Sequence, residues 1–188
     1  LKSLEGNFVP VRVRPRAPIQ KMSRLNIESI EAIVMDFDGV LTDNYVYLSE
    51  DGLEMVRCNR SDGMAIKALK EKGLKLFILS SEENKVVKSR ADKLSIRAIY
   101  GIKEKLSALK ELSIEESFNL SSTLYVGNDV NDLNCMKACN FSACPIDSHQ
   151  SIKKISTLQL KSKGGEGVIR ELAEEILNVH IFNTLYNH

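Results

Sequence analysis

Three short apolar runs constrain the fold of this chain more than any other feature. They cover residues 33–35, 76–79 and 124–126. Each run is continuous rather than alternating between apolar and polar residues, which is typical of strands buried on both faces of a parallel sheet. The segments between the runs show helical periodicity. We therefore expect an α/β, Rossmann-like fold in which helices flank a central parallel sheet.

The remaining elements follow from periodicity and turn residues. We expect helices over residues 62–72 and 85–94, around 102–109, from about 129, and over 166–177. Residues 45–58 differ from these segments, because two short strand-like stretches flank an Asp51-Gly52 pair. Asp-Gly between such stretches predicts a protruding β-hairpin.

Composition argues against several classes of function. The chain has 188 residues, with 26 Lys+Arg against 25 Asp+Glu and a formal net charge of +1, so we expect neither nucleic acid nor an anionic membrane surface as a partner. No apolar run approaches the ~20 residues of a membrane span. The four cysteines show neither CxxC spacing nor a neighbouring histidine. We interpret them as thiols of a cytoplasmic protein rather than as zinc ligands or disulfides.

One domain is expected over residues 30–180, because the chain is 43% hydrophobic and long enough for a single core. Residues 1–29 mix prolines and arginines without periodicity, as in a linker or an N-terminal arm. We interpret this arm as part of a longer polypeptide or as a segment that docks on a partner subunit. Residues 181–188 are expected to form a C-terminal tail.

Polar residues follow each of the three apolar runs. Asp36 and Asp38 come after the first run, Ser80 after the second, and an acidic loop over residues 127–132 after the third. The carboxyl ends of parallel strands form the ligand crevice of an open sheet. We therefore expect these three groups to lie close together.

The chemistry available to such a cluster includes phosphate ester hydrolysis. A carboxylate can attack a phosphate monoester to give an aspartyl phosphate, which fits Asp36, and a second carboxyl can protonate the leaving alkoxide, which fits Asp38. Ser80 and Lys105 can bind the phosphoryl oxygens. Each residue also has a plainer interpretation. Asp36 and Asp38 fit a solvated turn, Ser80 a helix cap and Lys105 a surface lysine.

The same residues offer oxygen ligands for Mg²⁺. The expected ligands are Asp36, Asp38, Asn128, Asp129 and Asp132, because hard cations prefer carboxylate and amide oxygens. A calcium loop is a weaker alternative, since the spacing of an EF-hand is absent.

At this point the sequence resembles the haloacid-dehalogenase (HAD) phosphohydrolases. Their motifs run in the order DxDx(T/V), Ser or Thr, Lys, and an acidic loop, and all four occur here in that order over about residues 30–145. A closer resemblance is to the small branch that dephosphorylates 2-keto-3-deoxy sugar acids of eight or nine carbons. It rests on residues 36–43, the hairpin, residues 60–63 and residues 164–170.

This resemblance implies a capless phosphatase that uses Mg²⁺ and a small phosphorylated sugar acid as its substrate. It also implies a homotetramer in which the hairpins join, and in which a neighbouring subunit and the C-terminal tail cover the active site. The residues that it implies at the substrate are Thr42, Arg60, Ser81, Glu82, Lys93, Gly164 and Gly165.

Two positions depart from the eight-carbon branch. Asn128 stands where that branch usually has Asp, which lowers the charge available to a metal. Ser80-Ser81-Glu82 stands where it typically has Thr-Gly-Arg. Glu82 can accept hydrogen bonds from sugar hydroxyls or from an amine, but it repels a carboxylate. With Lys93 in the following helix, this change favours a nine-carbon nonulosonate 9-phosphate over octulosonate 8-phosphate.

A second hypothesis treats the chain as a non-catalytic tetramerisation domain. The Pro/Arg arm is similar to the junction in bacterial proteins where an N-acylneuraminate cytidylyltransferase domain precedes a phosphatase domain. Asn128 is compatible with lost turnover, whereas retention of Asp36, Asp38, Ser80 and Lys105 favours the enzyme.

Overall fold

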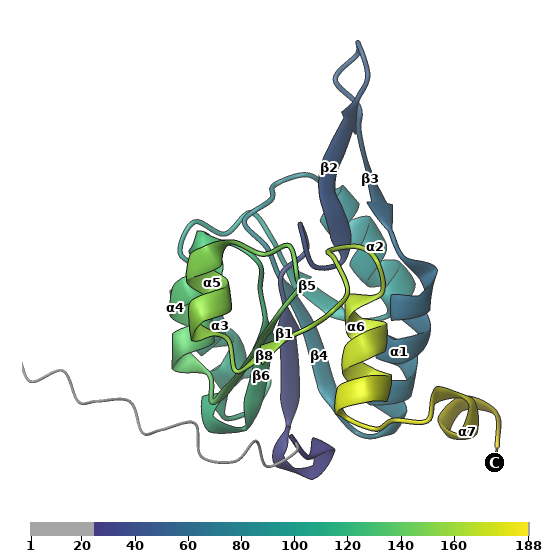
Figure 1. Cartoon of the computed structure of the whole chain (residues 1–188). Helices are drawn as coiled ribbons and strands as arrows, with labels where there is room; N and C mark the ends of the chain where they lie inside the picture. Colours follow the sequence, from purple (N-terminus) through teal and green to yellow (C-terminus); the bar gives the residue numbers. More distant parts are fainter. Residues whose placement is uncertain (1–24, 188) are drawn as a thin grey trace, which may run out of the picture.

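The computed structural model describes residues 25–187. Its main sheet has six parallel strands in the order β5-β4-β1-β6-β7-β8 (Figure 1). The strands are β1 (Ala32–Met35), β4 (Lys75–Leu79), β5 (Arg97–Ile99), β6 (Thr123–Val126), β7 (Phe141–Cys144) and β8 (Leu158–Gln159). The three predicted strands are β1, β4 and β6, which form the centre of the sheet. The predicted α/β fold is confirmed.

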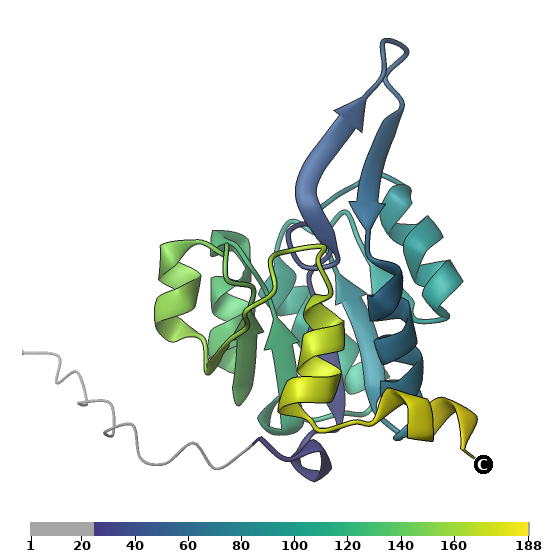
Figure 2. The same cartoon turned by 45° about the vertical axis from the view of Figure 1, so that its right-hand side comes forward.

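Helices cover both faces of this sheet (Figures 1 and 2). One layer contains α1 (Arg60–Glu71), α2 (Val86–Leu94), α6 (Val168–Glu171), which continues as a π-helical turn over Leu172–Ile176, and α7 (Ile181–Tyr186). The other layer contains α3 (Lys105–Glu115), α4 (Leu133–Ala138) and α5 (Gln150–Ile155). Successive residues of β1 alternate between the layers, so that Ile33 and Met35 join one core and Ala32 and Val34 join the other. This two-sided burial explains why the runs are continuously apolar.

Short 3-10 turns complete the described part, over Ile27–Ser29, Leu120–Ser122 and Val130–Asp132. Strands β5, β7 and β8 and helices α5 and α7 were not predicted. Helix α7 lies in the segment expected as a tail, and its Ile181 and Leu185 are buried in the core that α1 also lines. Residues 1–24 of the expected arm lie outside the described residues. Over residues 25–187, the structure contains no helix with both the length and the apolar character that crossing a membrane requires.

The predicted hairpin is present and projects from the body of the domain (Figure 2). Strands β2 (Thr42–Leu48) and β3 (Glu54–Cys58) pair in antiparallel fashion. Gly52 in the connecting loop has a φ of +80°, a left-handed conformation that favours glycine. Between β1 and α1 the chain forms only this hairpin. The described part therefore has no cap domain over the carboxyl edge of the sheet, as predicted.

Candidate active site

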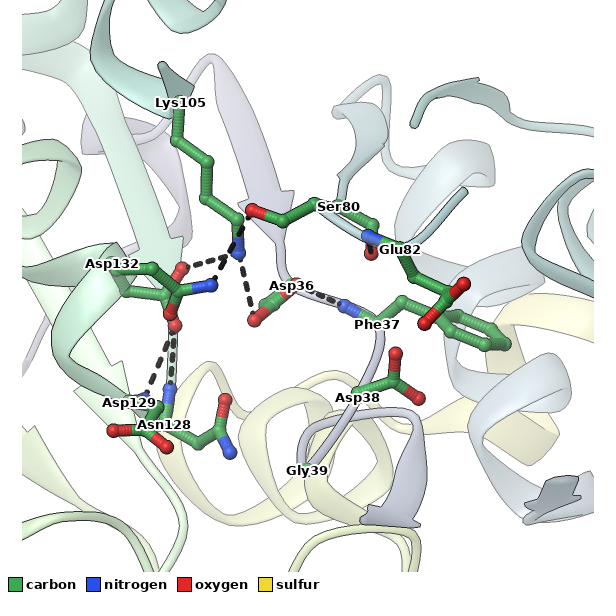
Figure 3. Close-up of polar contacts among 12 residues, drawn as sticks. Asp36, Phe37, Asp38, Gly39, Ser80, Glu82, Lys105, Asn128, Asp129 and Asp132 are labelled. Carbon is green, nitrogen blue, oxygen red and sulfur yellow. Dashed lines mark hydrogen bonds and ion pairs between the residues drawn. The ribbon is translucent and has the colours of Figure 1, made fainter. Parts of the chain in front are cut away.

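The site lies where the winding of the sheet changes direction. From β1 the chain moves outward through β4 and β5, and it then crosses to β6 on the other side of β1 and continues to β7 and β8. Ligands of open α/β sheets bind at such a switch point. Asp36 follows β1, Ser80 follows β4, and Asn128 follows β6 after one glycine. The predicted convergence of these residues is observed (Figure 3).

Lys105 begins α3, and its ammonium group lies between two carboxylates (Figure 3). Its Nζ atom is 2.8 Å from Asp36 Oδ2 and 2.9 Å from Asp132 Oδ1, and all three side chains are buried. Burial alone would lower the pKa of Lys105, but the two carboxylates outweigh burial and raise this pKa above its ordinary value. Lys105 therefore remains charged. The plainer interpretation of a surface lysine does not describe this residue.

The carboxylate of Asp36 is held from two sides. Phe37 donates its backbone N–H to Oδ1 at 2.7 Å, while Lys105 contacts Oδ2. Burial and the nearby charge of Asp132 raise the pKa of Asp36 to about 7, and Lys105 opposes the rise. Additional positive charge beside this carboxylate would lower its pKa and favour the ionised form that a nucleophile needs.

Asp38 lies two residues further along the same loop. The Thr42 hydroxyl donates to Asp38 Oδ1 at 3.1 Å and accepts the backbone N–H groups of Gly39 and Asn44 at 3.2 Å each. Burial raises the pKa of Asp38 and the charge of Glu82 adds to the rise, whereas the Thr42 hydroxyl opposes it. Thr42 itself is 0% exposed. Thr42 therefore orients Asp38, and the substrate contact that the resemblance implies for Thr42 stays a prediction.

Asn128 presents an amide oxygen to the same space. Its Oδ1 atom is buried and has no hydrogen-bond partner among residues 25–187, and Figure 3 shows it on the side of Asp36. Gly39 makes room for this side chain, since a Cβ at Gly39 would lie 1.9 Å from Asn128 Nδ2. Within residues 25–187, no three Asp, Glu, His or Cys side chains form a metal-binding group. An orphaned amide oxygen beside the Asp36 and Asp38 carboxylates nevertheless fits a hard cation such as Mg²⁺.

Asp132 has a different set of contacts from the metal ligand expected from the sequence. Its Oδ1 atom accepts hydrogen bonds from Lys105 Nζ and from the Tyr125 hydroxyl, both at 2.9 Å. Its Oδ2 atom accepts the backbone N–H groups of Asn128 at 2.9 Å and Asp129 at 3.3 Å. Four donors therefore occupy both carboxylate oxygens, and Asp132 acts in this structure as the organiser of the acidic loop.

Asp129 is exposed and borders the pocket beside Asp36. Its Oδ1 atom accepts the backbone N–H of Val130 at 2.7 Å, and its side chain also accepts the backbone N–H of Asp132 in a capping box. Its carboxylate nevertheless lines the cavity at Asp36, whereas Asp132 does not. Asp129 is therefore better placed than Asp132 to support a cation.

Two small cavities open at Asp36 and Asp38. One, of about 240 Å³, is lined by Asp36, Asp38, Ser80, Ser81, Glu82 and Asn131. The other, of about 200 Å³, shares Asp36, Asp38 and Asn131 and extends to Asn128 and Asp129. The Ser80 hydroxyl accepts the Glu82 N–H at 3.2 Å, which leaves its own proton for a ligand. Ser81 and Glu82 therefore lie beside the catalytic residues, where we expect the substrate.

Gly164 and Gly165 belong to a glycine strap, defined here as residues 161–167, that packs on the loop carrying Asp38. Gly165 donates its N–H to Val40 O at 3.0 Å and has a φ of +68°. A Cβ at Gly164 would lie 2.4 Å from Gly39 O, and one at Gly165 would lie 2.5 Å from Asp43 N. The glycines thus permit backbone-to-backbone contact with the catalytic loop.

Asp62 of α1 binds the start of α6, which directly follows the glycine strap. Its Oδ1 atom accepts the N–H groups of Ile169 and Arg170 at 2.9 Å each, and its Oδ2 atom is buried without a partner. Burial raises the pKa of Asp62 to about 6, although the two N–H bonds oppose the rise.

Arg60 and Lys93 do not join the catalytic residues within this chain. They line a separate cavity of about 450 Å³ between α1 and α2, together with three further basic residues, Lys67, Lys70 and Arg90. This basic cavity is distinct from the two cavities at Asp36.

Sequence reasoning missed Tyr125, Asn131 and Asp62. A tyrosine hydroxyl within an otherwise apolar strand, directly before an acidic loop, is a signal that could have indicated Tyr125. Asn131 could have been found from its place in that loop. Nothing in the sequence indicated the bond between Asp62 and α6, because 107 positions separate Asp62 from Ile169.

Comparisons with known proteins agree with this geometry. No protein-family model matches the chain. A protein from Streptomyces avermitilis assigned to the HAD family of hydrolases has a structure that is 40% identical with a TM-score of 0.80, and the match covers 83% of this chain and 90% of that one. The structure of 3-deoxy-D-manno-octulosonate 8-phosphate phosphatase from Moraxella catarrhalis, in complex with magnesium, phosphate and KDO, is 30% identical with a TM-score of 0.77. That match covers 81% of this chain and 88% of that one.

A curated relative of a different activity also matches. N-acylneuraminate cytidylyltransferase A of Danio rerio is 30% identical over 154 residues, which are 80% of this chain but only 35% of that protein. The chain thus spans about a third of the cytidylyltransferase. It matches nearly the whole length of the two solved structures. The chain therefore belongs to the HAD family of hydrolases, on the branch that contains the 3-deoxy-D-manno-octulosonate 8-phosphate phosphatases, which are phosphoric monoester hydrolases.

Proposed function

We propose that this chain is a magnesium-dependent phosphatase that hydrolyses the phosphate monoester of a 2-keto-3-deoxy sugar acid, with Asp36 as the nucleophile. The observation that carries the proposal is the arrangement around Asp36. Lys105 holds one oxygen at 2.8 Å, while the orphaned Asn128 oxygen and the Asp38 carboxyl face the same space.

The reaction begins when an Asp36 oxygen attacks phosphorus. The bond from phosphorus to the sugar oxygen breaks, and Asp38 gives its proton to the leaving alkoxide, so that the free sugar acid and an aspartyl phosphate form. Asp38 then takes a proton from water as the water oxygen attacks the phosphoryl group. Inorganic phosphate leaves and both carboxyl groups return to their starting states.

The phosphoryl group is held by residues on three elements. Ser80 offers its hydroxyl proton, and Lys105 keeps Asp36 in place while it adds positive charge. Asp36, Asp38 and Asn128 would hold Mg²⁺, with Asp129 at the edge of the site, and the cation would neutralise charge on the phosphoryl oxygens. Asp132 would support this group by fixing Lys105.

For the sugar acid, we favour a nine-carbon nonulosonate 9-phosphate over octulosonate 8-phosphate. Glu82 lines the cavity beside Ser80, and its carboxylate suits the hydroxyl groups or the amine of a longer sugar chain. The match to a cytidylyltransferase that acts on N-acylneuraminate supports a nine-carbon acid, whereas the match to the Moraxella enzyme supports an eight-carbon acid.

The hairpin supports assembly of several copies of the chain. Tyr45, Leu48 and Leu53 are 73%, 70% and 61% exposed, which is unusual for large apolar side chains at the edge of a strand pair. We propose that the hairpins join in a homotetramer of a cytoplasmic enzyme. Fusion to a cytidylyltransferase domain and the 1–29 arm also remain proposals, whereas the domain expected over residues 30–180 extends through α7.

The test is hydrolysis of p-nitrophenyl phosphate with and without Mg²⁺, followed by nononate 9-phosphate, its N-acetylated analogue and octulosonate 8-phosphate. We expect magnesium-dependent turnover and the highest kcat/KM on a nine-carbon ester. A folded protein with no turnover on any of the four esters would support the non-catalytic tetramerisation domain instead. If octulosonate 8-phosphate is clearly the best substrate, our interpretation of Glu82 is wrong.

A further inference from the structure

Asn84 is the centre of a hydrogen-bond group that connects the nucleophile cavity to the hairpin. It lies in the loop between β4 and α2, two residues after Glu82. Its backbone N–H donates to Glu82 Oε1 at 2.7 Å. Glu82 lines the cavity at Asp36, and this backbone bond holds one oxygen of its carboxylate.

The side chain of Asn84 uses both of its polar atoms. Its Oδ1 atom accepts the N–H of Val86 at 3.1 Å and so fixes the start of α2. Its Nδ2 atom donates to Glu54 Oε2 at 2.9 Å, and Glu54 is the first residue of β3. An amide offers an acceptor and a donor on one short side chain, and this position needs both.

The bond to Glu54 has an electrostatic consequence for the catalytic acid. Glu54 and Glu82 are the two glutamates whose charges raise the pKa of Asp38. Figure 3 shows Glu82 and Asp38 turned toward one another. Asn84 is a neutral donor to both glutamates, to Glu82 through its backbone and to Glu54 through its side chain, and it holds each carboxylate at a fixed place.

We infer that Asn84 is a specificity-positioning residue: it orients Glu82 toward the part of the substrate beyond the phosphate, and it ties this orientation to the hairpin through Glu54. The inference rests on the proposed function, because it requires Glu82 to meet the substrate. It goes beyond that function by assigning selectivity to a bond between the cavity loop and the hairpin. Movement of the hairpin, which carries the exposed apolar side chains, then changes how Glu82 is presented.

The experiment uses the full chain and four proteins: the unmodified chain, Asn84→Asp, Glu54→Gln, and the double variant. Asn84→Asp keeps an acceptor for Val86 N–H but places a second carboxylate against Glu54. We expect it to lower the ratio of kcat/KM on nononate 9-phosphate to kcat/KM on p-nitrophenyl phosphate by about tenfold, the usual scale for a lost hydrogen bond to a charged group. In the double variant, the new amide at position 54 can donate to the new carboxylate at position 84, so the bond returns with its polarity reversed. The ratio should recover to within about threefold of its original value.

Glu54→Gln alone tests the hydrogen bond between Asn84 and Glu54 at its acceptor. The glutamine amide oxygen introduced at position 54 can still accept from Asn84, so we expect a change of less than about threefold in the ratio. Glu83→Gln is the matched control, because Glu83 is exposed and forms none of these bonds. An Asn84→Asp variant that slows both esters equally, or a double variant that shows no recovery, would overturn the inference.

Calorimetric binding of nononate 9-phosphate in the presence of Mg²⁺, measured on any of the four proteins that shows no turnover, separates this inference from the proposed function. If no protein hydrolyses either ester but Asn84→Asp weakens binding about tenfold and the double variant restores it, the phosphatase proposal fails and the assignment of Asn84 stands. If turnover is normal and the selectivity ratio does not move, only the assignment of Asn84 fails. Absence of both turnover and binding refutes both.

Discussion

Replacing Asp132 with Asn tests whether this residue organises the site or binds a metal. In the structure, both oxygens of Asp132 accept two hydrogen bonds each, from Lys105 and Tyr125 on one side and from two backbone N–H groups on the other. An Asn side chain has one oxygen and one NH2 group. Whichever way it turns, two donors face the NH2 group and lose their acceptor.

The magnitude follows from those two lost bonds. Each buried donor left without a partner costs about 1–3 kcal/mol, and the ion pair with Lys105 loses its negative charge as well. We therefore expect Asp132→Asn to lower the free energy of unfolding by about 3–5 kcal/mol. Because Lys105 would no longer be fixed beside Asp36, we also expect kcat on p-nitrophenyl phosphate to fall at least about a hundredfold, on the scale of about 2.7 kcal/mol.

The assay is a Mg²⁺ titration of turnover together with urea unfolding of each variant. Added Mg²⁺ should not restore kcat in Asp132→Asn, since the missing part is the position of Lys105. Asp129→Asn is the matched control. Asp129 is exposed, so this variant should change stability by less than about 1 kcal/mol while raising the Mg²⁺ concentration needed for half-maximal rate. If Asp132→Asn is stable and regains its full rate at high Mg²⁺, Asp132 does not act by positioning Lys105 and the acidic loop. It would then be a ligand of Mg²⁺.

Three further predictions concern single side chains. Asp36→Asn should abolish turnover on every ester while circular dichroism shows an intact fold, and near-normal rates would exclude Asp36 as the nucleophile. Asn128→Asp should lower the Mg²⁺ concentration for half-maximal rate severalfold, because a carboxylate attracts Mg²⁺ more than an amide does; an unchanged Mg²⁺ titration would count against Asn128 as a ligand. Asp62 has a pKa of about 6 in the fold against an ordinary 3.8, so the stability that it contributes is complete below pH 3.8 and is lost as the pH rises through 6. Relative to Asp62→Asn, the unmodified chain should therefore lose up to about 3 kcal/mol of unfolding free energy between about pH 4 and pH 7. Urea unfolding of both proteins measures this, and a difference in unfolding free energy that is constant with pH would contradict the prediction.

The central strands and the meeting of their polar ends could be predicted because they depend on local patterns. Strands buried on both faces must be apolar throughout, and parallel strands must end at a common edge, so the order of residues along the chain is enough to bring Asp36, Ser80 and Asn128 together. Strands β5, β7 and β8 could not be predicted in this way. Strands β5 and β8 have three and two residues and lie at the edges of the sheet, where no residue of β5 and one residue of β8 are buried. In β7 a serine interrupts the apolar run.

The roles of individual polar residues were harder to predict, because they depend on which donors the fold brings near each oxygen. Asp132 and Asp129 look equivalent in the sequence, yet one accepts four hydrogen bonds and is buried whereas the other is exposed. Thr42 has a residue type suited to substrate contact, but its hydroxyl is buried against Asp38. Residue types therefore indicated the chemistry of the site, whereas the role of each residue depends on its tertiary contacts.

The charges at the site indicate that the proposed reaction requires a cation. The two cavities at Asp36 are lined by Asp36, Asp38, Glu82 and Asp129 and by neutral residues, and no lysine or arginine of residues 25–187 lines either cavity. Lys105 lies behind Asp36 and is already paired with two carboxylates. A phosphate monoester dianion that enters this space meets net negative charge, which costs several kcal/mol at short range. On the proposed function, productive binding of the phosphate ester therefore requires that Mg²⁺ binds first. Asn128 is a neutral ligand, so it lowers the affinity of the site for Mg²⁺ and also lowers the repulsion of the incoming phosphate.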